Sequence, residues 1–302
     1  MTRAIDLFAG FGGFSLGAQR AGVDVLWAAN HWRLAVDTHA ANHPGVEHAC
    51  QDLRQADFHS LPDFDLLLAS PACQGHSSAS QPKRRRYHDS LRATAWAVVD
   101  AADAKEPEAL VIENVPDFRR WRLYQPWKAA LAALGYRLEE HLVVASAHGV
   151  PQRRTRLFIT GTRSKAAPEL RLESVGPEPA IGDFLEADAP GWRSIEKAQP
   201  GAQKRIAKGR ANHGDRFITQ HVTGHPGIPL GEPIRTVTTK EMFALVEGDQ
   251  YRPLTLREYG RAMGFPDSYE LPQVKRADVI KGLGNAVCPP VAEAVVGAVL
   301  AA

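Results

Sequence analysis

The chain has 302 residues, 44% of them apolar, and a formal net charge of +2. This length predicts one large domain, or one domain with a small second one. The near-neutral charge excludes binding of nucleic acid through a global positive field, so any such surface must come from local clusters. The three scattered cysteines exclude a disulfide framework or a zinc site built from them.

The expected location follows from two features that the sequence lacks. No charged leader precedes the first strand pattern, and no apolar run reaches the roughly 18 residues of a membrane span. We therefore expect a soluble, cytoplasmic protein with no membrane partner.

The first pattern is a strand over 4–8, a glycine turn over 9–13 and a helix over 14–21. This order is typical of nucleotide-binding sheets, because glycines let the backbone approach a ligand and the helix offers free N–H groups. No Lys-Ser or Lys-Thr pair ends the turn, so it is not a phosphate-cradling P-loop. A tight turn without a ligand has the same pattern. The candidate ligand residues here are Gly10, Phe11, Gly12 and Gly13.

A second strand is followed by Asn30, His31 and Trp32. In nucleotide-binding sheets, the end of this strand usually carries an acid that binds ribose hydroxyls. Here Asn30 is the candidate, with Trp32 as a stacking surface, unless both are ordinary loop residues. After a short third strand, Asp52 either accepts a hydrogen bond from an adenine amino group or caps a helix beside Leu53.

The apolar run 64–68 predicts a buried parallel strand, which small residues and a proline end just before Cys73. Ligands bind where the strands of an α/β sheet end. Cys73 is thus placed as a thiolate nucleophile, with a free pKa of about 8.5 that a cationic neighbourhood lowers. The alternative is a buried cysteine that caps the strand.

Small polar residues over 77–81 predict a mobile loop. The cations after this loop suit a polyanion backbone or form a solvated face, and they are Lys83, Arg84, Arg85 and Arg86.

The strand 109–112 ends at Glu113, on the edge where Cys73 is expected. A desolvated carboxyl there acts as an acid with a raised pKa, unless it is a helix cap or a surface group. Further on, Arg154 and Arg156 alternate in an expected strand and should share a face. They would hold a base carbonyl and a phosphate, or form a solvated pair.

The region 164–234 is rich in proline, glycine, histidine and charge, and it predicts a small second domain. Its histidines have no metal-ligand spacing. We expect order to resume at 235 and a turn over 282–287. An almost wholly apolar helix over 291–300 should return to pack on the first domain. The basic residues of the region that we expect to contact nucleic acid are Lys204, Arg205, Lys208 and Arg210.

Six ordered blocks span nearly the whole chain outside 164–234. Each is weak alone, but together and in this order they resemble the DNA cytosine-5 methyltransferase family. A Rossmann oxidoreductase would explain only the first block. The blocks are Asp6 to Gly13, Pro71 to Gln74, Glu113 to Val115, Gln152 to Arg156, Arg235 to Thr238 and Gly284 to Val287.

The resemblance implies an α/β fold, a Rossmann-like methyltransferase sheet with helices on both faces, plus a small irregular target-recognition domain. Residues 1–163 would bind the cofactor and carry catalysis, 164–234 would recognise the target, and 235–302 would complete the catalytic domain. The implied cofactor is S-adenosylmethionine, with S-adenosylhomocysteine as product and no metal. Besides the residues named above, the implied cofactor contacts are Phe8 against the adenine, Pro71, Asn285, Ala286 and Val287.

The implied reaction methylates C5 of a cytosine that is flipped out of duplex DNA. Cys73 would add to C6, Glu113 would stabilise charge near N3, and Arg156 with Arg154 would hold O2 and a phosphate. The loop 74–92 would close over the base with its cations on phosphates. The sequence does not identify the base that removes the C5 proton, nor does it distinguish Ser78 as the residue that fills the vacated stack. The expected DNA contacts of this loop are Gln74, Ser77 and Ser78, with Lys83 to Arg86.

Two positions depart from the family pattern. Ala72 stands where the family has a second proline, and Asn30 where it has an acid, which predicts a slower reaction and weaker cofactor binding. The expected setting is a bacterial or phage enzyme paired with a restriction endonuclease. The alternatives are a transfer-RNA cytosine-5 methyltransferase and a catalytically silent DNA-binding relative. The intact Cys73, Glu113 and Arg156 argue against the silent relative.

Overall fold

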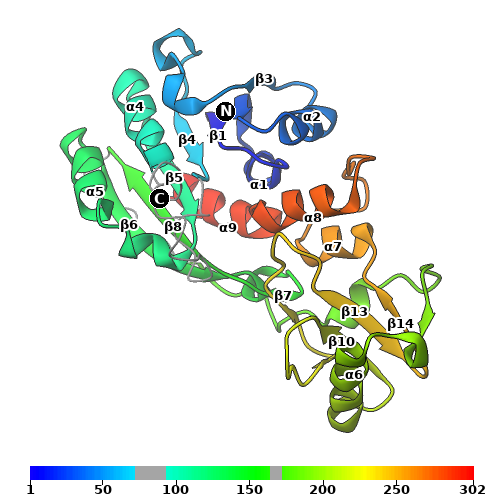
Figure 1. The fold of residues 1–302 in the computed structure, drawn as a ribbon. Coiled ribbons are helices and arrows are strands. Elements are labelled where there is room, and N and C mark those ends of the chain that lie inside the picture. The colour runs from blue at the N-terminus through cyan, green and yellow to red at the C-terminus, as the bar shows by residue number, and fades with distance from the viewer. Residues whose placement is uncertain (72–92, 164–171) are drawn as a thin grey trace. The chain divides into compact units, whose positions relative to one another are not determined.

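The computed structural model describes residues 1–71, 93–163 and 172–302. The chain divides into two compact units, and each unit combines segments that are distant in the sequence (Figure 1). The first unit comprises Met1–Val144, Thr155–Glu173 and Ala286–Ala302, and the second comprises Ala145–Arg154 and Ser174–Asn285.

The first unit is built on a seven-stranded sheet of order β3-β2-β1-β4-β5-β8-β6. Among these seven strands, β8 runs antiparallel to its neighbours β5 and β6, and the other pairs are parallel. Continuous apolar runs form the central strands because helices cover both faces of a parallel sheet. The strands are β1 (Arg3–Leu7), β2 (Asp24–Asn30), β3 (Glu47–Cys50), β4 (Leu66–Ala69), β5 (Ala109–Asn114), β6 (Arg137–Val144) and β8 (Thr155–Thr162).

Helices lie on both faces of this sheet, with α4 and α5 on one side and α1 and α9 on the other (Figure 1). The expected Rossmann-like α/β fold with a mainly parallel sheet is confirmed. The helices of this unit are α1 (Gly13–Arg20), α2 (Arg33–Asn42), α4 (Trp96–Lys105), α5 (Tyr124–Ala133) and α9 (Pro289–Leu300).

One continuous apolar core fills the space between the sheet and helix α4. Ile5, Leu67 and Ile112 from three strands and Val98 from α4 are fully buried in it. Because strand side chains alternate between faces, the residues beside them in sequence point to the opposite helices. The packing of α4 therefore fixes which residues of each strand face α1 and α9.

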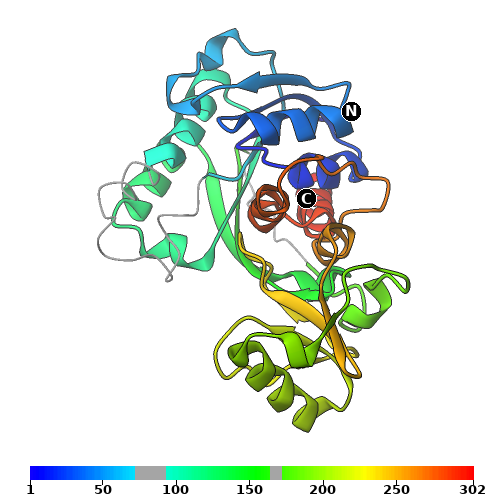
Figure 2. The ribbon, with the colours of Figure 1, turned by 45° about the vertical axis from the view of Figure 1, so that its right-hand side comes forward.

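Helix α9 packs against α1 at very short range, and the two helices lie side by side in both views (Figure 1, Figure 2). A Cβ atom on Gly17 would lie 2.4 Å from the Cβ of Ala292 and 2.5 Å from the backbone oxygen of Pro289. Such distances are shorter than van der Waals contact, so this approach requires glycine in α1. Pro289 is the first residue of α9, where the missing N–H costs no helical hydrogen bond.

The second unit contains a five-stranded antiparallel sheet of order β11-β10-β13-β14-β9, and a separate parallel pair of β7 and β12. Its strands are β7 (Gln152–Arg153), β9 (Arg193–Ser194), β10 (Arg216–Gln220), β11 (Ile228–Pro229), β12 (Ile234–Arg235), β13 (Phe243–Glu247) and β14 (Gln250–Pro253). Its helices are α6 (Pro200–His213), α7 (Leu256–Ala262) and α8 (Arg276–Asn285).

The second unit extends beyond the expected region 164–234 on both sides. Strand β10 pairs with β13 along its whole length, from Arg216 opposite Glu247 to Gln220 opposite Phe243. Since β13 comes after residue 234, that region does not complete its own sheet. Helix α8 includes residues 282–285, so the turn expected over 282–287 is wrong for its glycines, which are helical. The chain bends only at Ala286, before α9 begins at Pro289.

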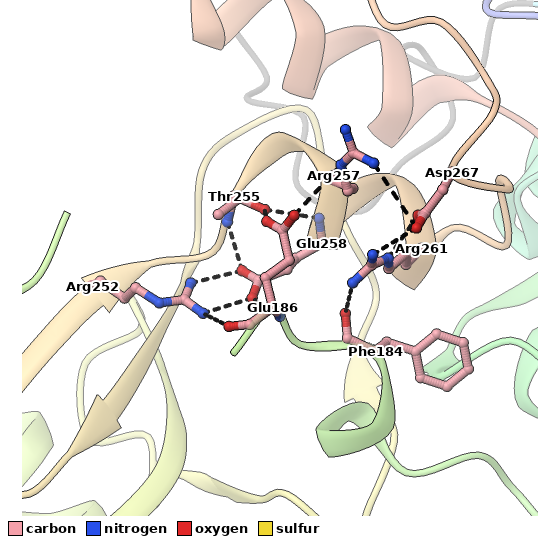
Figure 3. A network of polar contacts seen from close by, with 8 residues as sticks. All are labelled: Phe184, Glu186, Arg252, Thr255, Arg257, Glu258, Arg261 and Asp267. Carbon is pink, nitrogen blue, oxygen red and sulfur yellow. Dashed lines mark hydrogen bonds and ion pairs between the residues drawn. The ribbon is translucent and has the colours of Figure 1, made fainter. Parts of the chain in front are cut away.

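A buried ion pair connects β14 to α7 in the second unit (Figure 3). Arg252 donates to both carboxylate oxygens of Glu258, at 2.8 and 2.7 Å, and both side chains are fully buried. Glu258 also accepts from the backbone N–H groups of Thr255 and Glu186. A buried pair is stable only when such further hydrogen bonds satisfy it. Thr255 and Glu258 complete a capping box, which fixes the start of α7.

Among the described residues, the stretch Arg276–Leu300 has the length and mean hydropathy, 1.5, of a membrane-spanning helix. It consists of α8 and α9, with a break between Asn285 and Pro289. Of its most apolar window, 56% is buried inside the protein. Core helices have the same composition, so this stretch is weak evidence for a membrane span.

We expect Gly17→Ala to lower the free energy of unfolding by about 1–3 kcal/mol, because the added methyl group forces α1 away from α9. Urea unfolding measures this change. Gly297→Ala is the matched control, since this α9 glycine has no atom within 4 Å of its Cβ position. It should leave stability unchanged or raise it by up to about 1 kcal/mol through helix propensity. Equal stability of the Gly17 variant and the wild type would contradict the packing argument.

Candidate active site

The carboxyl ends of β1, β4 and β5 meet at one edge of the first unit's sheet. Ser70, just after β4, donates its N–H to the carbonyl of Leu7 at 3.0 Å. Asn114, the last residue of β5, donates from Nδ2 to the carbonyl of Pro71 at 3.0 Å. Both bonds hold the segment that leads to Cys73. Open α/β sheets bind ligands at this edge.

The expected nucleophile and its loop lie outside the described residues. Pro71 is the last described residue before them, and it is buried at the sheet edge. The positions of the loop side chains therefore stay predictions. The residues concerned are Cys73, Gln74, Ser77, Ser78, Lys83, Arg84, Arg85 and Arg86.

Glu113 and Arg156 come together on the face of the sheet opposite α4. Arg156 Nε lies 3.0 Å from Glu113 Oε1, and the two side chains are 16% and 9% exposed. Glu113 is paired in register with Phe158, and Arg156 precedes Phe158 by two residues, so strand alternation puts them on one face. The ion pair orients the carboxylate that the sequence predicted at the end of β5.

The turn after β1 has the backbone that the glycine pattern predicts. Phe8 has a φ of 63°, and Gly10 and Gly12 have φ values of 58° and 78°. A left-handed phenylalanine costs about 1–3 kcal/mol and is found where surrounding structure imposes it, often at ligand sites. Gly12 is the N-cap of α1, which has no side-chain cap and no acid in its first turn. Its first N–H groups can thus bind an anionic or polar ligand.

The residues expected around an adenosine group have clear roles in the described chain. Asn30 Oδ1 accepts from the backbone N–H of Trp32 at 3.0 Å. The Trp32 ring stacks on Phe11 at 5.9 Å between centroids, with planes 20° apart. His31 is exposed. Hence Asn30 and Trp32 form an ordered corner after β2 rather than a loose loop.

Asp52 caps a short 3₁₀ helix, which is the second of the two roles that the sequence left open. It accepts from the backbone N–H of Arg54 at 3.1 Å and pairs with the Arg54 guanidinium. These bonds to Arg54 lower the pKa of Asp52. Leu53 is 2% exposed and packs in the core with Ile5 and Leu67, so its side chain belongs to the core.

Arg154 does not share a face with Arg156, and that expectation is wrong. It lies between β7 and β8, outside both strands, so strand alternation does not apply to it. Its side chain is buried and donates to the carbonyls of Val237 and Gly284, both at 3.0 Å. The guanidinium thus holds backbone within the second unit.

Gln152 is a buried residue whose role sequence reasoning missed. Its Oε1 accepts from the N–H of Val237 at 2.7 Å, and its Nε2 donates to the carbonyl of Ala262 at 2.8 Å. A Cβ atom on Gly284 would lie 2.3 Å from the Thr238 carbonyl oxygen. Residues from the last three sequence blocks, which begin at Gln152, Arg235 and Gly284, thus meet at one buried junction. The only sequence signal for this contact was that the three blocks occur together.

A family model for C-5 cytosine-specific DNA methylases matches residues 2–301. The chain belongs to this family. It is 33% identical to the type II methyltransferase M.NlaX of Neisseria lactamica, over 98% of this chain and 95% of the relative. It is 28% identical to M.NgoBI of Neisseria gonorrhoeae, over 97% and 92% of the two chains. The crystal structure of the S. pombe Dnmt2 methyltransferase matches with a TM-score of 0.70 and 20% identity, covering 99% of this chain and 98% of that one.

These findings confirm the resemblance that the six blocks indicated, and with it the expectation of a DNA cytosine-5 methyltransferase. Members of this family use S-adenosylmethionine and act on DNA. No cluster of three metal-ligating side chains occurs among the residues that the structure describes.

The glycine turn fits this cofactor. A Cβ atom on Gly10 would have one neighbour within 4 Å, the Phe8 carbonyl at 3.9 Å, so the turn leaves room for a ligand. The open start of α1 supplies N–H donors for a carboxylate. At the end of the chain, Ala286 and Val287 are buried in the first unit, and Asn285 ends α8 in the second.

The basic residues of α6 differ in how far their charge is neutralised. Arg210 pairs with Asp215 at 3.1 Å and Asp249 at 3.4 Å. Lys204 and Lys208 are exposed, and within the described ranges neither has a carboxylate partner. Lys208 donates to the carbonyl of Gly224 at 2.7 Å. Arg205 is half-buried. Lys204 and Lys208 thus offer the more available charges for a phosphate backbone.

We expect Asn114→Ala to slow methyl transfer about 10- to 100-fold, because the Pro71 segment loses the donor that holds it, and loss of position at a nucleophile has this size of effect. Single-turnover kinetics with bound DNA measure it. The Asn114→Asp variant keeps the shape and the oxygen that accepts from Val115, but it lacks the donor, so it should be similarly slow. A fully active Asp variant would contradict the role of this bond.

Proposed function

We propose that this enzyme transfers a methyl group from S-adenosylmethionine to C5 of a flipped-out cytosine in a specific short sequence of duplex DNA. The observation that carries the proposal is the sheet edge where Asn114 holds the segment before Cys73 while Glu113 and Arg156 pair beside it. An acid, a guanidinium and the approach to a thiol at one strand end suit addition to a polarised ring.

In this mechanism, the Cys73 thiolate forms a bond to C6 of the cytosine. Electron density moves towards N3 and C5. Glu113 acts here in its protonated form and donates its proton to N3. Arg156 holds Glu113 in place and offers its remaining N–H groups to O2. Such general acid help is typically worth about 10²–10⁴-fold.

The bound cofactor supplies the electrophilic methyl group that C5 attacks. A base then takes the C5 proton, the S–C6 bond breaks, and Cys73 leaves as the thiolate. N3 returns its proton to Glu113, which regenerates the acid. Phe8, Phe11, Trp32 and the glycine turn 10–13 would hold the adenosine and amino-acid parts. Pro71 and Ala286 to Val287 complete the cofactor surface in this proposal. Arg154 takes no part in the reaction, because its guanidinium is bound to the carbonyls of Val237 and Gly284.

The second unit would bind the DNA around the target. Lys204 and Lys208 on α6 would contact phosphates, together with the loop cations Lys83 to Arg86. Because the similar proteins are type II methyltransferases, we propose that the enzyme works in the cytoplasm beside a restriction endonuclease of the same specificity.

Labelled S-adenosylmethionine, supplied with mixed-sequence duplex DNA or with transfer RNA, tests substrate and reaction together. We expect label at C5 of cytosine in DNA, and none with Cys73→Ala. Sequencing the modified DNA gives the recognised site. Label only on transfer RNA would overturn the DNA substrate, and undiminished label with Cys73→Ala would overturn the covalent mechanism.

We expect Glu113→Gln to lower kcat about 10²–10⁴-fold, since the amide no longer provides an acid at N3. Its dissociation constant for S-adenosylhomocysteine should stay within about twofold of the wild type, because the cofactor does not contact this group in our mechanism. Calorimetry and single-turnover assays separate the two effects. An equal loss of cofactor binding would place Glu113 in the cofactor site instead.

A further inference from the structure

Four buried or half-buried titratable side chains form a cluster beside α1 and α2 in the first unit, and the proposed mechanism uses none of them. Asp6 on β1 is fully buried, and His39 and His43 on α2 are 1% and 2% exposed. His48 on β3 is half-buried. Burial of so many ionisable groups is costly, so their contacts require an explanation.

A chain of hydrogen bonds joins three of these groups through Ser15. The Ser15 hydroxyl donates to Asp6 Oδ2 at 2.8 Å, and His39 Nε2 lies 3.0 Å from the same hydroxyl. His39 Nδ1 lies 2.8 Å from His48 Nε2. Since Ser15 donates to Asp6, Nε2 of His39 must carry its hydrogen, and Nδ1 accepts from His48. Each ring nitrogen of a neutral His39 thus has a partner.

His43 connects the same cluster to the glycine turn. Its Nδ1 lies 2.8 Å from Gln19 Oε1, and its ring lies 4.3 Å from that of His39. A hydrogen bond to the Gly12 backbone also acts on its ring. Gly12, Ser15 and Gln19 are spaced by three and four residues, so they share one face of α1. The cluster therefore contacts α1 at its N-cap and on its next two turns.

We propose that His39 and His43 are positioning residues for the glycine turn: as neutral imidazoles they fix the Gly12 end of α1, and the cofactor binds tightly only while they do. The identity of the ligand rests on the proposed function, in which this turn holds S-adenosylmethionine. The link between the two buried histidines and the turn is set by the contacts of this chain alone.

The neutral state follows from the surroundings of the rings. Burial, together with the neighbouring His43 and His48, lowers the pKa of His39 well below its usual value. Burial and His48 lower the pKa of His43 to about 4, against the opposing bond to Gly12. Burial lowers the pKa of His48 and raises that of Asp6 to about 7. A second proton on His39 would occupy Nδ1, where His48 donates.

The direction of the pH effect follows from the lowered pKa values of the two histidines, which together outweigh the raised pKa of Asp6 that acts in the opposite direction. When the turn opens, His39 and His43 regain a pKa near the ordinary 6.5 and take up protons that the closed state rejects. The closed turn is therefore fully stabilised above about pH 6.5 and loses stability as the pH falls towards about 4. Cofactor affinity should decline through the same range.

The test measures the dissociation constant of S-adenosylhomocysteine by calorimetry at about pH 8 and about pH 5. We expect the wild type to bind about tenfold more weakly at the lower pH. The double variant His39→Gln with His43→Gln keeps hydrogen-bonding groups that cannot gain a charge. It should bind within about threefold of the wild type at the higher pH and lose most of the pH dependence.

Two further variants separate positioning from general stability. His39→Leu removes both hydrogen bonds of the ring and should weaken binding about tenfold even at the higher pH. His141→Gln is the matched control, because this half-buried histidine on β6 also has a pKa lowered by burial and contacts Thr160 at 3.2 Å. It should keep the wild-type pH profile. Circular dichroism at both pH values checks that each variant is folded.

A wild type whose affinity is equal at both pH values would overturn the inference. The inference would also be overturned if the double glutamine variant, or each of the two single glutamine variants, kept the full pH dependence of wild-type cofactor affinity. A wild type that binds no S-adenosylhomocysteine at the higher pH would overturn the cofactor assignment and the inference with it. Cofactor binding with the expected pH profile but no DNA methylation would uphold the inference and contradict only the proposed catalysis.

Discussion

The hydrogen bond from Asn114 to the Pro71 carbonyl ties the ends of two neighbouring parallel strands together. The register of β4 and β5, with Ala69 opposite Ile112, brings Pro71 and Asn114 to the same height at the sheet edge. Asn114 is preceded by Glu113, whose side chain points to the other face and meets Arg156. Two adjacent residues thus hold the loop segment and present the acid. A shift of register by one residue would exchange their faces and lose both contacts.

Two buried polar clusters, one in each unit, are satisfied in different ways. In the second unit, Arg252 and Glu258 are fully buried as a charged pair, with Thr255 and Glu186 supplying the N–H groups that complete the carboxylate's bonds. This pair joins a strand to a capped helix. The junction needs a fixed geometry and no change in the protonation of either side chain. In the first unit, the groups around Ser15 are arranged as donors and acceptors; burial keeps His39 neutral and raises the pKa of Asp6 to about 7. Such a chain can respond to a change in protonation, whereas the charged pair cannot.

The strands and Glu113 could be predicted from the sequence because continuous apolar runs mark buried parallel strands and the polar residue after each run marks its end. The expected strand 109–112 lies within β5, and the acid follows directly. Arg154 could not be placed in this way. The prediction assumed one uninterrupted strand, but β7 pairs with β12, some 80 residues later in the chain, and the backbone leaves strand geometry between β7 and β8. Similarly, Gly282 and Gly284 suggested a turn but lie in a helix. The small size of Gly284 is required by the Thr238 backbone, which is distant in sequence and could not be foreseen.

The histidines of the first unit also show which part of a site can be predicted from sequence spacing and which part cannot. His39 and His43 are four residues apart, and this spacing alone places them on one face of α2. What they do there depends on groups from other elements: His48 on β3, Asp6 on β1, and Ser15 and Gln19 on α1. An imidazole has two nitrogens on opposite sides of the ring, so one buried histidine can join two elements at once. Through these bonds β1, α2 and β3 are joined to one another, and β1 and α2 are joined to α1, which begins at the glycine turn.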